Sequence, residues 1–233
     1  MKLLLFDIDG TLLWTDGAGR RAIHRALVEE LGAAGPIEGF RFDGKTDPQI
    51  VQELLALAGH PDACDAARVD AVCRRYVELL RAELAKPTQV TRLMAGVGDL
   101  LAALEPHEAT GRALVGLLTG NLEAGAALKL ASAGIEPRRF AVGAYGSDSP
   151  RRADLPEIAA RRAAALTGHA FRGADLVIVG DTPEDVACGH PIGACAVAVA
   201  TGFFDVRALR AAGATHVFES LTDTAAVVDA LLG

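Results

Sequence analysis

The sequence predicts an α/β protein with a doubly wound parallel sheet and a small inserted all-helical domain. Three observations predict it: short apolar runs that are continuous rather than alternating, helical patterns between these runs, and one long segment with helical patterns only. A continuous apolar run is typical of a strand buried on both faces. Strands that alternate with helices favour a parallel sheet covered on both sides. Hydrophobic residues make up 51% of the 233 residues, which is enough for such a core.

Five apolar runs are predicted to be strands, and a sixth, Thr215–Phe218, is a weaker candidate. The five are Leu3–Phe6, Ala113–Leu118, Phe140–Ala144, Leu176–Val179 and Cys195–Ala200. Between them, apolar residues recur at the spacing of a helix face. These helical segments are Asp99–Leu104, Glu123–Ala133, Leu155–Leu166 and Thr222–Leu232.

From about residue 15 to residue 89 the sequence has helical patterns and no strand-like run. The predicted helices are Arg20–Leu31, Asp47 to about Ala58, and Asp62–Leu84. Such a block, inserted after the first strand, indicates a separate small domain. We expect a core of residues 1–14 and 90–233, a helical domain of residues 15–89, and hinges near Trp14–Gly17 and Lys86–Thr91.

Charge and cysteine usage exclude several classes of protein. The net charge of −7 argues against nucleic-acid binding and against binding to acidic membranes, both of which need a basic surface. The four cysteines form no C-x-x-C pair, so neither a zinc site nor a redox motif is indicated, and a reducing compartment is expected. No apolar run is long enough to span a membrane. We expect a soluble, cytoplasmic monomer or homodimer.

Polar residues follow the predicted strands, where ligands bind in open parallel sheets. The segments are Asp7-Ile8-Asp9-Gly10-Thr11-Leu12, Thr119-Gly120-Asn121, residues 146–152, and Gly180-Asp181-Thr182-Pro183-Glu184-Asp185. Taken singly, each of these residues is an ordinary loop or helix-cap residue. Together, carboxylates at the ends of buried strands repel one another unless a cation joins them. Hard oxygen ligands suit Mg²⁺, so the set predicts a magnesium site.

These motifs resemble those of the haloacid dehalogenase superfamily. The matching residues are Asp7-x-Asp9-Gly10-Thr11-Leu12, Thr119-Gly120-Asn121, Arg152, and Gly180-Asp181-x-x-x-Asp185. The resemblance covers essentially the whole chain, with residues 15–89 as the family's helical cap, and it is strongest to the phosphoglycolate-phosphatase-like branch. It implies a Rossmann-like core and an Mg²⁺-dependent phosphatase that acts on a small phosphorylated metabolite, such as a phosphoglycolate-like or sugar phosphate.

The resemblance also implies a role for each motif. Asp7 would attack phosphorus and form an aspartyl-phosphate, and Asp9 would protonate the leaving oxygen and later activate water. Mg²⁺ would be held by Asp7, the backbone carbonyl of Asp9, Asp181 and Asp185. Thr119 would hold the phosphoryl group. The substrate-binding residues of these motifs would be Gly10, Thr11, Gly120 and Asn121.

The third motif departs from the family pattern. The family usually places a lysine before the fourth strand, but residues 149–156 contain none, and Lys129 lies earlier, within a predicted helix. We assign the required positive charge to Arg152, with Arg151 as the alternative.

Substrate choice is expected to come from the cap. The segment Gly44-Lys45-Thr46-Asp47 precedes a helix, so it is either an ordinary helix start or a loop that reads the substrate through Lys45. The glycines at 17 and 19 match the residue spacing of a dinucleotide-binding motif, but they begin ten residues after the strand and not at its end. We interpret them as a hinge. A phosphomutase of the β-phosphoglucomutase type and a non-catalytic phospho-ligand-binding protein stay open as alternatives.

Overall fold

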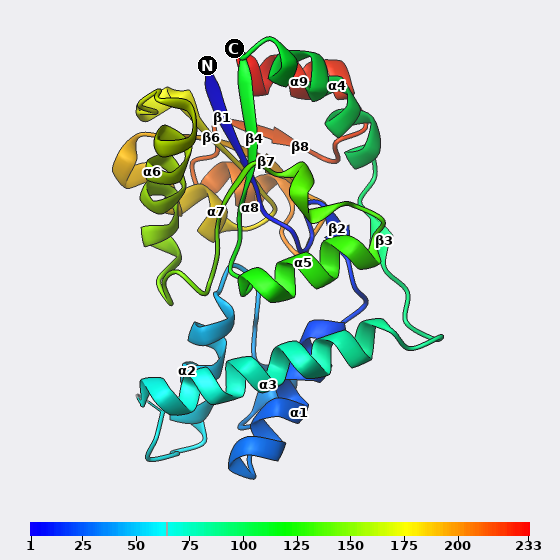
Figure 1. The fold of residues 1–233 in the computed structure, drawn as a ribbon, viewed down its shortest axis with the longest axis vertical. Helices are drawn as coiled ribbons and strands as arrows, with labels where there is room; N and C mark the ends of the chain where they lie inside the picture. The colour runs from blue at the N-terminus through cyan, green and yellow to red at the C-terminus, as the bar shows by residue number, and fades with distance from the viewer. Residues whose placement is uncertain (64) are drawn as a thin grey trace.

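The computed structural model describes residues 1–63 and 65–233 and contains a six-stranded parallel sheet with helices on both faces (Figure 1). The strand order is β5-β4-β1-β6-β7-β8, and every neighbouring pair is parallel. The strands are β1 (Lys2–Phe6), β4 (Ala113–Leu118), β5 (Val142–Ala144), β6 (Leu176–Gly180), β7 (Cys195–Val199) and β8 (His216–Phe218). All six predicted strands are present, and the predicted fold class is confirmed.

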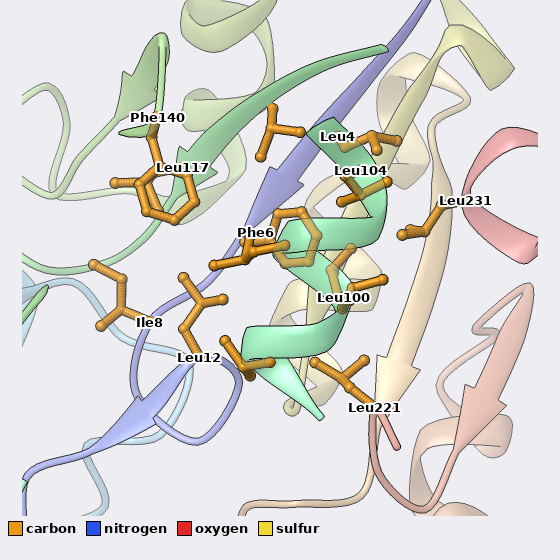
Figure 2. Close-up of a cluster of buried hydrophobic side chains, with 14 of the residues drawn as sticks. Leu4, Phe6, Ile8, Leu12, Leu100, Leu104, Leu117, Phe140, Leu221 and Leu231 are labelled. Carbon is orange, nitrogen blue, oxygen red and sulfur yellow. The ribbon is translucent and has the colours of Figure 1, made fainter. Parts of the chain in front are cut away.

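Two layers of helices cover the sheet because the buried strands alternate their side chains between its faces. Leu4 and Phe6 of β1 pack with Leu100 on one face (Figure 2), whereas Leu3 and Leu5 belong to the cluster on the other. The first face is covered by α4 (Val97–Ala109), α5 (Glu123–Ser132) and α9 (Thr224–Leu232). The second is covered by α6 (Leu155–Thr167), α7 (Pro183–Cys188) and α8 (Val206–Ala211).

Three further helices form a second hydrophobic cluster of their own. They are α1 (Ala18–Leu31), α2 (Asp47–Leu57) and α3 (Ala66–Leu84), and we call them the cap helices. In Figure 1 they lie below the sheet, and α3 packs against the core helix α5. The described residues between 15 and 89 contain no strand, as expected. The exact domain bounds stay a prediction.

A short antiparallel ribbon, which the sequence does not predict, lies where the chain passes between the core and the cap helices. It pairs β2 (Leu13–Trp14) with β3 (Arg92–Leu93). Next to it, the Gln89 side-chain amide donates a hydrogen bond to the Thr15 carbonyl. The two predicted hinge segments are therefore held side by side.

Some predicted helix bounds are wrong. The third cap helix begins at Ala66 and not at Asp62, because the Asp65 carboxylate accepts hydrogen bonds from the N–H groups of Ala67 and Arg68 and so caps the helix there. The predicted range also contained Cys64, which lies outside the described residues. The short helices α7 and α8 were not predicted. No helix in the described part of the chain is long and apolar enough to cross a membrane.

The centre of the sheet should be the most sensitive part of the core. Phe6 is fully buried, so Phe6→Ala should lower the free energy of unfolding by about 3–5 kcal/mol, from lost burial and the cavity left behind. Val28 on α1 is 45% exposed, and Val28→Ala should change the free energy of unfolding by no more than about 0.5 kcal/mol. Urea titration followed by circular dichroism measures both. Equal effects of the two substitutions would contradict this view of the core.

Candidate active site

Three carboxylates meet at the carboxyl edge of the sheet because their strands are neighbours. Asp7 follows β1, Asp181 follows β6, and these two strands pair directly. Asp185 joins them from the first turn of α7. One oxygen of each of the three side chains lies within 4.8 Å of the others, and all three residues are buried. The predicted metal-ligand carboxylates are thus together, and Asp9 lies two residues beyond Asp7.

Burial makes the charged forms of these groups costly. It is the main cause that raises the pKa of Asp7 to about 6; Arg152 opposes the shift, and the Asp185 charge adds to it. Burial also raises the pKa of Asp181 well above its ordinary value, and the charges of Asp185 and Asp7 raise it further. The cluster therefore favours an additional positive charge, whether a cation or protons.

Arg152 supplies one positive charge from inside the protein. It is 7% exposed, its Nη2 lies 3.3 Å from Asp7 Oδ2, and the same nitrogen contacts Asp185 Oδ1. Arg151 points away: its side chain is 79% exposed and pairs with Asp154 at 3.0 Å. Of the two candidates for the third motif, the structure brings only Arg152 to the site.

Asp9 is held by two neighbours at the edge of the cavity. Its Oδ2 accepts a hydrogen bond of 2.8 Å from Asn121 Nδ2 and one of 2.5 Å from Lys129 Nζ. Asn121 in turn donates to Thr119 Oγ1 at 2.8 Å. The first and second motifs are therefore linked through side chains, and Lys129 of α5 belongs to the same network.

Gly10 and Thr11 shape the surroundings of Asp181. The Thr11 hydroxyl donates to Asp181 Oδ1 at 3.1 Å. Gly10 has a φ of +83°, and a Cβ there would stand 2.4 Å from Asp181 Oδ2, so only glycine fits. A Cβ at Gly202 would come even nearer to the same oxygen. The two glycines thus allow the backbone to approach the Asp181 carboxylate closely.

A cavity of about 190 Å³ lies between these core residues and the cap helices. Its core lining includes Asp7, Asp9, Thr119, Gly120, Asn121, Lys129, Arg152 and Asp181. Its cap lining includes Gly19, Arg20, Ile23, Phe42, Gly44, Lys45, Asp47, Ile50 and Tyr76. The cavity therefore offers the motif residues on one side and residues of the helical insert on the other.

The cap loop at residues 44–47 packs directly on the core. The Asp47 N–H donates to the Gly120 carbonyl at 2.8 Å, and the Thr46 hydroxyl donates to the Pro150 carbonyl at 2.8 Å. A Cβ at Gly120 would stand 2.1 Å from the Lys45 carbonyl oxygen, so this approach requires glycine. Thr46 also caps α2, which is the ordinary role considered for this loop.

Lys45 lines the cavity but already has a carboxylate partner. Its Nζ lies 2.9 Å from Glu53 Oε2 within the cap. Tyr76 of α3 also lines the cavity, is 1% exposed, and its Oη has no hydrogen-bond partner among the described residues. Burial, together with the charges of Asp47 and Asp9, keeps the pKa of Tyr76 well above its ordinary value, so the hydroxyl stays a donor.

Lys129 and Tyr76 are not among the site residues predicted from the sequence. The signal for Lys129 was available, because it occupies the buried stripe of α5 with Gly125, Ala126 and Leu130, where an apolar residue is expected. Tyr76 gave no such signal, since tyrosine is common in the core of an amphipathic helix.

Comparisons with known proteins give a family match for part of the chain and a fold match for nearly all of it. A family model described as HAD-hydrolase-like matches residues 156–224. No curated protein sequence matches the chain.

Solved structures match over nearly the whole length. A hydrolase from Pseudomonas syringae has a TM-score of 0.75 at 18% identity and covers 100% of both chains. CbbY from Rhodobacter sphaeroides, in complex with xylulose-(1,5)bisphosphate, has a TM-score of 0.74 at 19% identity over 96% of both chains. A predicted phosphoglycolate phosphatase from Haemophilus somnus has a TM-score of 0.66 at 18% identity over 98% of both. The family model confirms the predicted resemblance to haloacid dehalogenase-like hydrolases over residues 156–224, and with it the prediction of an enzyme of this class. The solved structures confirm the predicted fold over nearly the whole chain.

The two adjacent arginines make a matched pair for testing the site. Arg152→Met removes the buried charge beside Asp7 and should lower kcat/KM for a phosphate monoester by at least about 100-fold, the usual loss for a fixed electrostatic contact. Arg151→Met removes an exposed charge and should lower kcat/KM less than about threefold. Steady-state kinetics on both variants, with circular dichroism as a check of folding, measures this. The opposite ranking would transfer the role to Arg151.

Proposed function

We propose that this haloacid dehalogenase-like protein is an Mg²⁺-dependent phosphatase that hydrolyses a small phosphate monoester through an aspartyl-phosphate. The observation that carries the proposal is the buried pairing of Asp7 with Arg152 at the floor of a cavity roofed by the cap helices. A carboxylate at that position can attack phosphorus, and a fixed guanidinium beside it can offset the charge of both the nucleophile and the phosphoryl group.

The residues at the sheet edge fit a magnesium ion. Asp7, Asp181 and Asp185 present three clustered oxygens against one arginine, and Asp7 and Asp181 also line the cavity. We propose that these carboxylates and the backbone carbonyl of Asp9 hold Mg²⁺. When bound, the ion would offset negative charge so that an anionic carboxylate and an anionic phosphate can approach.

The chain's own residues can account for both chemical steps. An Asp7 oxygen attacks phosphorus while Asp9 gives a proton to the leaving oxygen, so that an alcohol departs and an aspartyl-phosphate remains. Asp9 then takes a proton from water, whose oxygen attacks the same phosphorus and releases inorganic phosphate and Asp7. We propose that Thr119 and the nearby backbone N–H groups hold phosphoryl oxygens; Thr119, Gly120 and Asn121 all line the cavity, which supports this role.

The substrate side of the cavity suits a small leaving group that carries oxygen. Tyr76 Oη offers a buried donor in the lining of the cavity, beside the Asp47 carboxylate. Arg20 offers a guanidinium that is held by the carbonyls of Ile37 and Phe40. These features support a phosphoglycolate-like or sugar phosphate as substrate.

Turnover should depend on both Asp7 and a divalent cation. Asp7→Asn removes the nucleophile at nearly constant shape, and it should abolish hydrolysis of 4-nitrophenyl phosphate without unfolding the protein. EDTA should abolish the wild-type activity, and Mg²⁺ should restore it. Inorganic phosphate release measures turnover, and mass spectrometry of acid-quenched enzyme detects the phosphorylated Asp7.

Three outcomes would contradict the proposal. If Asp7→Asn keeps normal turnover, the covalent mechanism is wrong. If the wild-type protein isomerises a sugar phosphate and releases no inorganic phosphate, it is a mutase, and if it binds phosphate esters without turnover, it is a binding protein.

Lys45 should affect specificity more than chemistry. Lys45→Ala should lower kcat/KM for a substrate with a second anionic group by about tenfold, which corresponds to one charge-assisted hydrogen bond, and should leave 4-nitrophenyl phosphate nearly unaffected. Glu53→Gln is the matched variant: it frees the Lys45 ammonium from its partner and should raise kcat/KM for the same anionic substrate. Equal effects of Lys45→Ala on both substrates, or no effect on either, would leave Lys45 with a structural role only.

A further inference from the structure

Lys129 is a second buried cation of the cavity, and no motif accounts for it. It lies on α5, within the core, and is 4% exposed. Its neighbours on the buried stripe of the helix are Gly125, Ala126 and Leu130. A lysine in that stripe loses the hydration of its ammonium, a loss that an apolar side chain of similar length would not incur. Polar contacts of the ammonium must therefore compensate for its lost hydration.

The ammonium is offset by two strong contacts with the same network. Lys129 Nζ donates to Asp9 Oδ2 at 2.5 Å and to Asn121 Oδ1 at 2.6 Å. Asn121 Nδ2 donates to the same Asp9 oxygen at 2.8 Å. The three side chains form a closed triangle, and two of its three contacts are hydrogen bonds from a charged donor.

Both contacts to Asp9 go to one oxygen. Oδ2 accepts from Lys129 and from Asn121, and among residues 1–63 and 65–233 no hydrogen bond engages Oδ1. The Asp9 side chain is 37% exposed, and it lines the cavity. The hydrogen bonds thus anchor one oxygen of Asp9 and leave the other without a donor, in a side chain that lines the cavity.

We propose that Lys129 is a positioning residue that holds Asp9 so that its free oxygen faces the leaving group of the substrate. This inference rests on the proposed phosphatase function, in which Asp9 transfers a proton to the leaving oxygen. General acid catalysis requires the acid within hydrogen-bond reach of the atom it protonates, so a rotated carboxyl loses most of the benefit. Arg152 forms an ion pair with Asp7, and Lys129 forms an ion pair with Asp9.

The cap helices close over this contact. A Cβ at Gly19 of α1 would lie 3.5 Å from Lys129 Nζ and 3.6 Å from Tyr76 Oη, so the first turn of this cap helix passes close to both side chains. Gly19, Lys129 and Tyr76 all line the cavity.

The test uses two substrates of similar size that differ in their need for an acid. Benzyl phosphate loses a poor, strongly basic leaving group and needs protonation, whereas 4-nitrophenyl phosphate loses a stable anion and needs little. The quantity compared is kcat/KM, which reports the steps up to aspartyl-phosphate formation. The variants are Lys129→Met, which keeps length without charge, Lys129→Arg, which keeps the charge, and Lys86→Met. The last is a control that removes a lysine paired with Glu83, half-exposed on the cap.

Lys129→Met should lower kcat/KM for benzyl phosphate at least about tenfold more than for 4-nitrophenyl phosphate, within the range that general acids contribute. Lys129→Arg should recover part of that loss, and Lys86→Met should change neither substrate. Asp9→Asn should show the same selectivity as Lys129→Met, but more strongly. A crystal structure of Lys129→Met should place the Asp9 carboxyl in another orientation.

Three results would overturn the inference. An equal loss on both substrates would mean that Lys129 acts on the phosphoryl group or on stability, and no loss would mean that it does not act through Asp9. An unchanged Asp9 orientation in the Lys129→Met crystal would overturn positioning even if no suitable alkyl substrate is hydrolysed. A wild-type protein without phosphatase activity would instead refute the proposed function, so the two failures are distinguishable.

Discussion

The contact between Arg152 and two buried carboxylates is the interaction on which the rest of the site depends. Three carboxylates meet at the sheet edge because β1 and β6 are neighbours and α7 begins just after β6. Without a fixed cation, these carboxylates would have to bind protons, or like-charge repulsion would push them apart. Arg152 lies between Asp7 and Asp185 and holds them in place. One guanidinium does not balance three carboxylates, and the remaining charge is what suits the site to a divalent ion.

The two aspartates of the first motif experience different surroundings, although they are two residues apart. Asp7 is buried beside Arg152, whereas the Asp9 side chain is partly exposed to the cavity and contacts Lys129. In the proposed mechanism, Asp7 as nucleophile would benefit from a fixed position in a dry environment, and Asp9 as proton donor would benefit from access to the leaving group. The turn after β1 creates this difference, since it leaves one side chain in the core and carries the next acid out to the cavity edge.

Most of the sheet could be predicted from the sequence, because strands buried on both faces appear as continuous apolar runs. The β2–β3 ribbon could not, since two residues per strand give no period, and the six-residue helices α7 and α8 are too short to show a stripe. The motif residues were predictable because each follows a strand. The contact between Lys129 and Asp9 joins positions 120 residues apart, so no local pattern reports it. Which of two adjacent arginines points inward likewise depends on the local turn and not on spacing.

The position of the cap and the conformation of the motif loops are physically coupled. Asp47 hydrogen-bonds through its N–H to Gly120, the residue after Thr119, and through its carboxylate to the N–H of Leu122, the residue after Asn121. Thr46 contacts the carbonyl of Pro150, two residues before Arg152. A displacement of the loop at residues 44–47 must break contacts with the segments that carry the second and third motifs. The position of this cap loop and the conformation of the segments that carry the second and third motifs are therefore coupled in this fold. In the proposed phosphatase, this coupling would let the cap helices favour a substrate by stabilising the arrangement in which its phosphate meets Asp7.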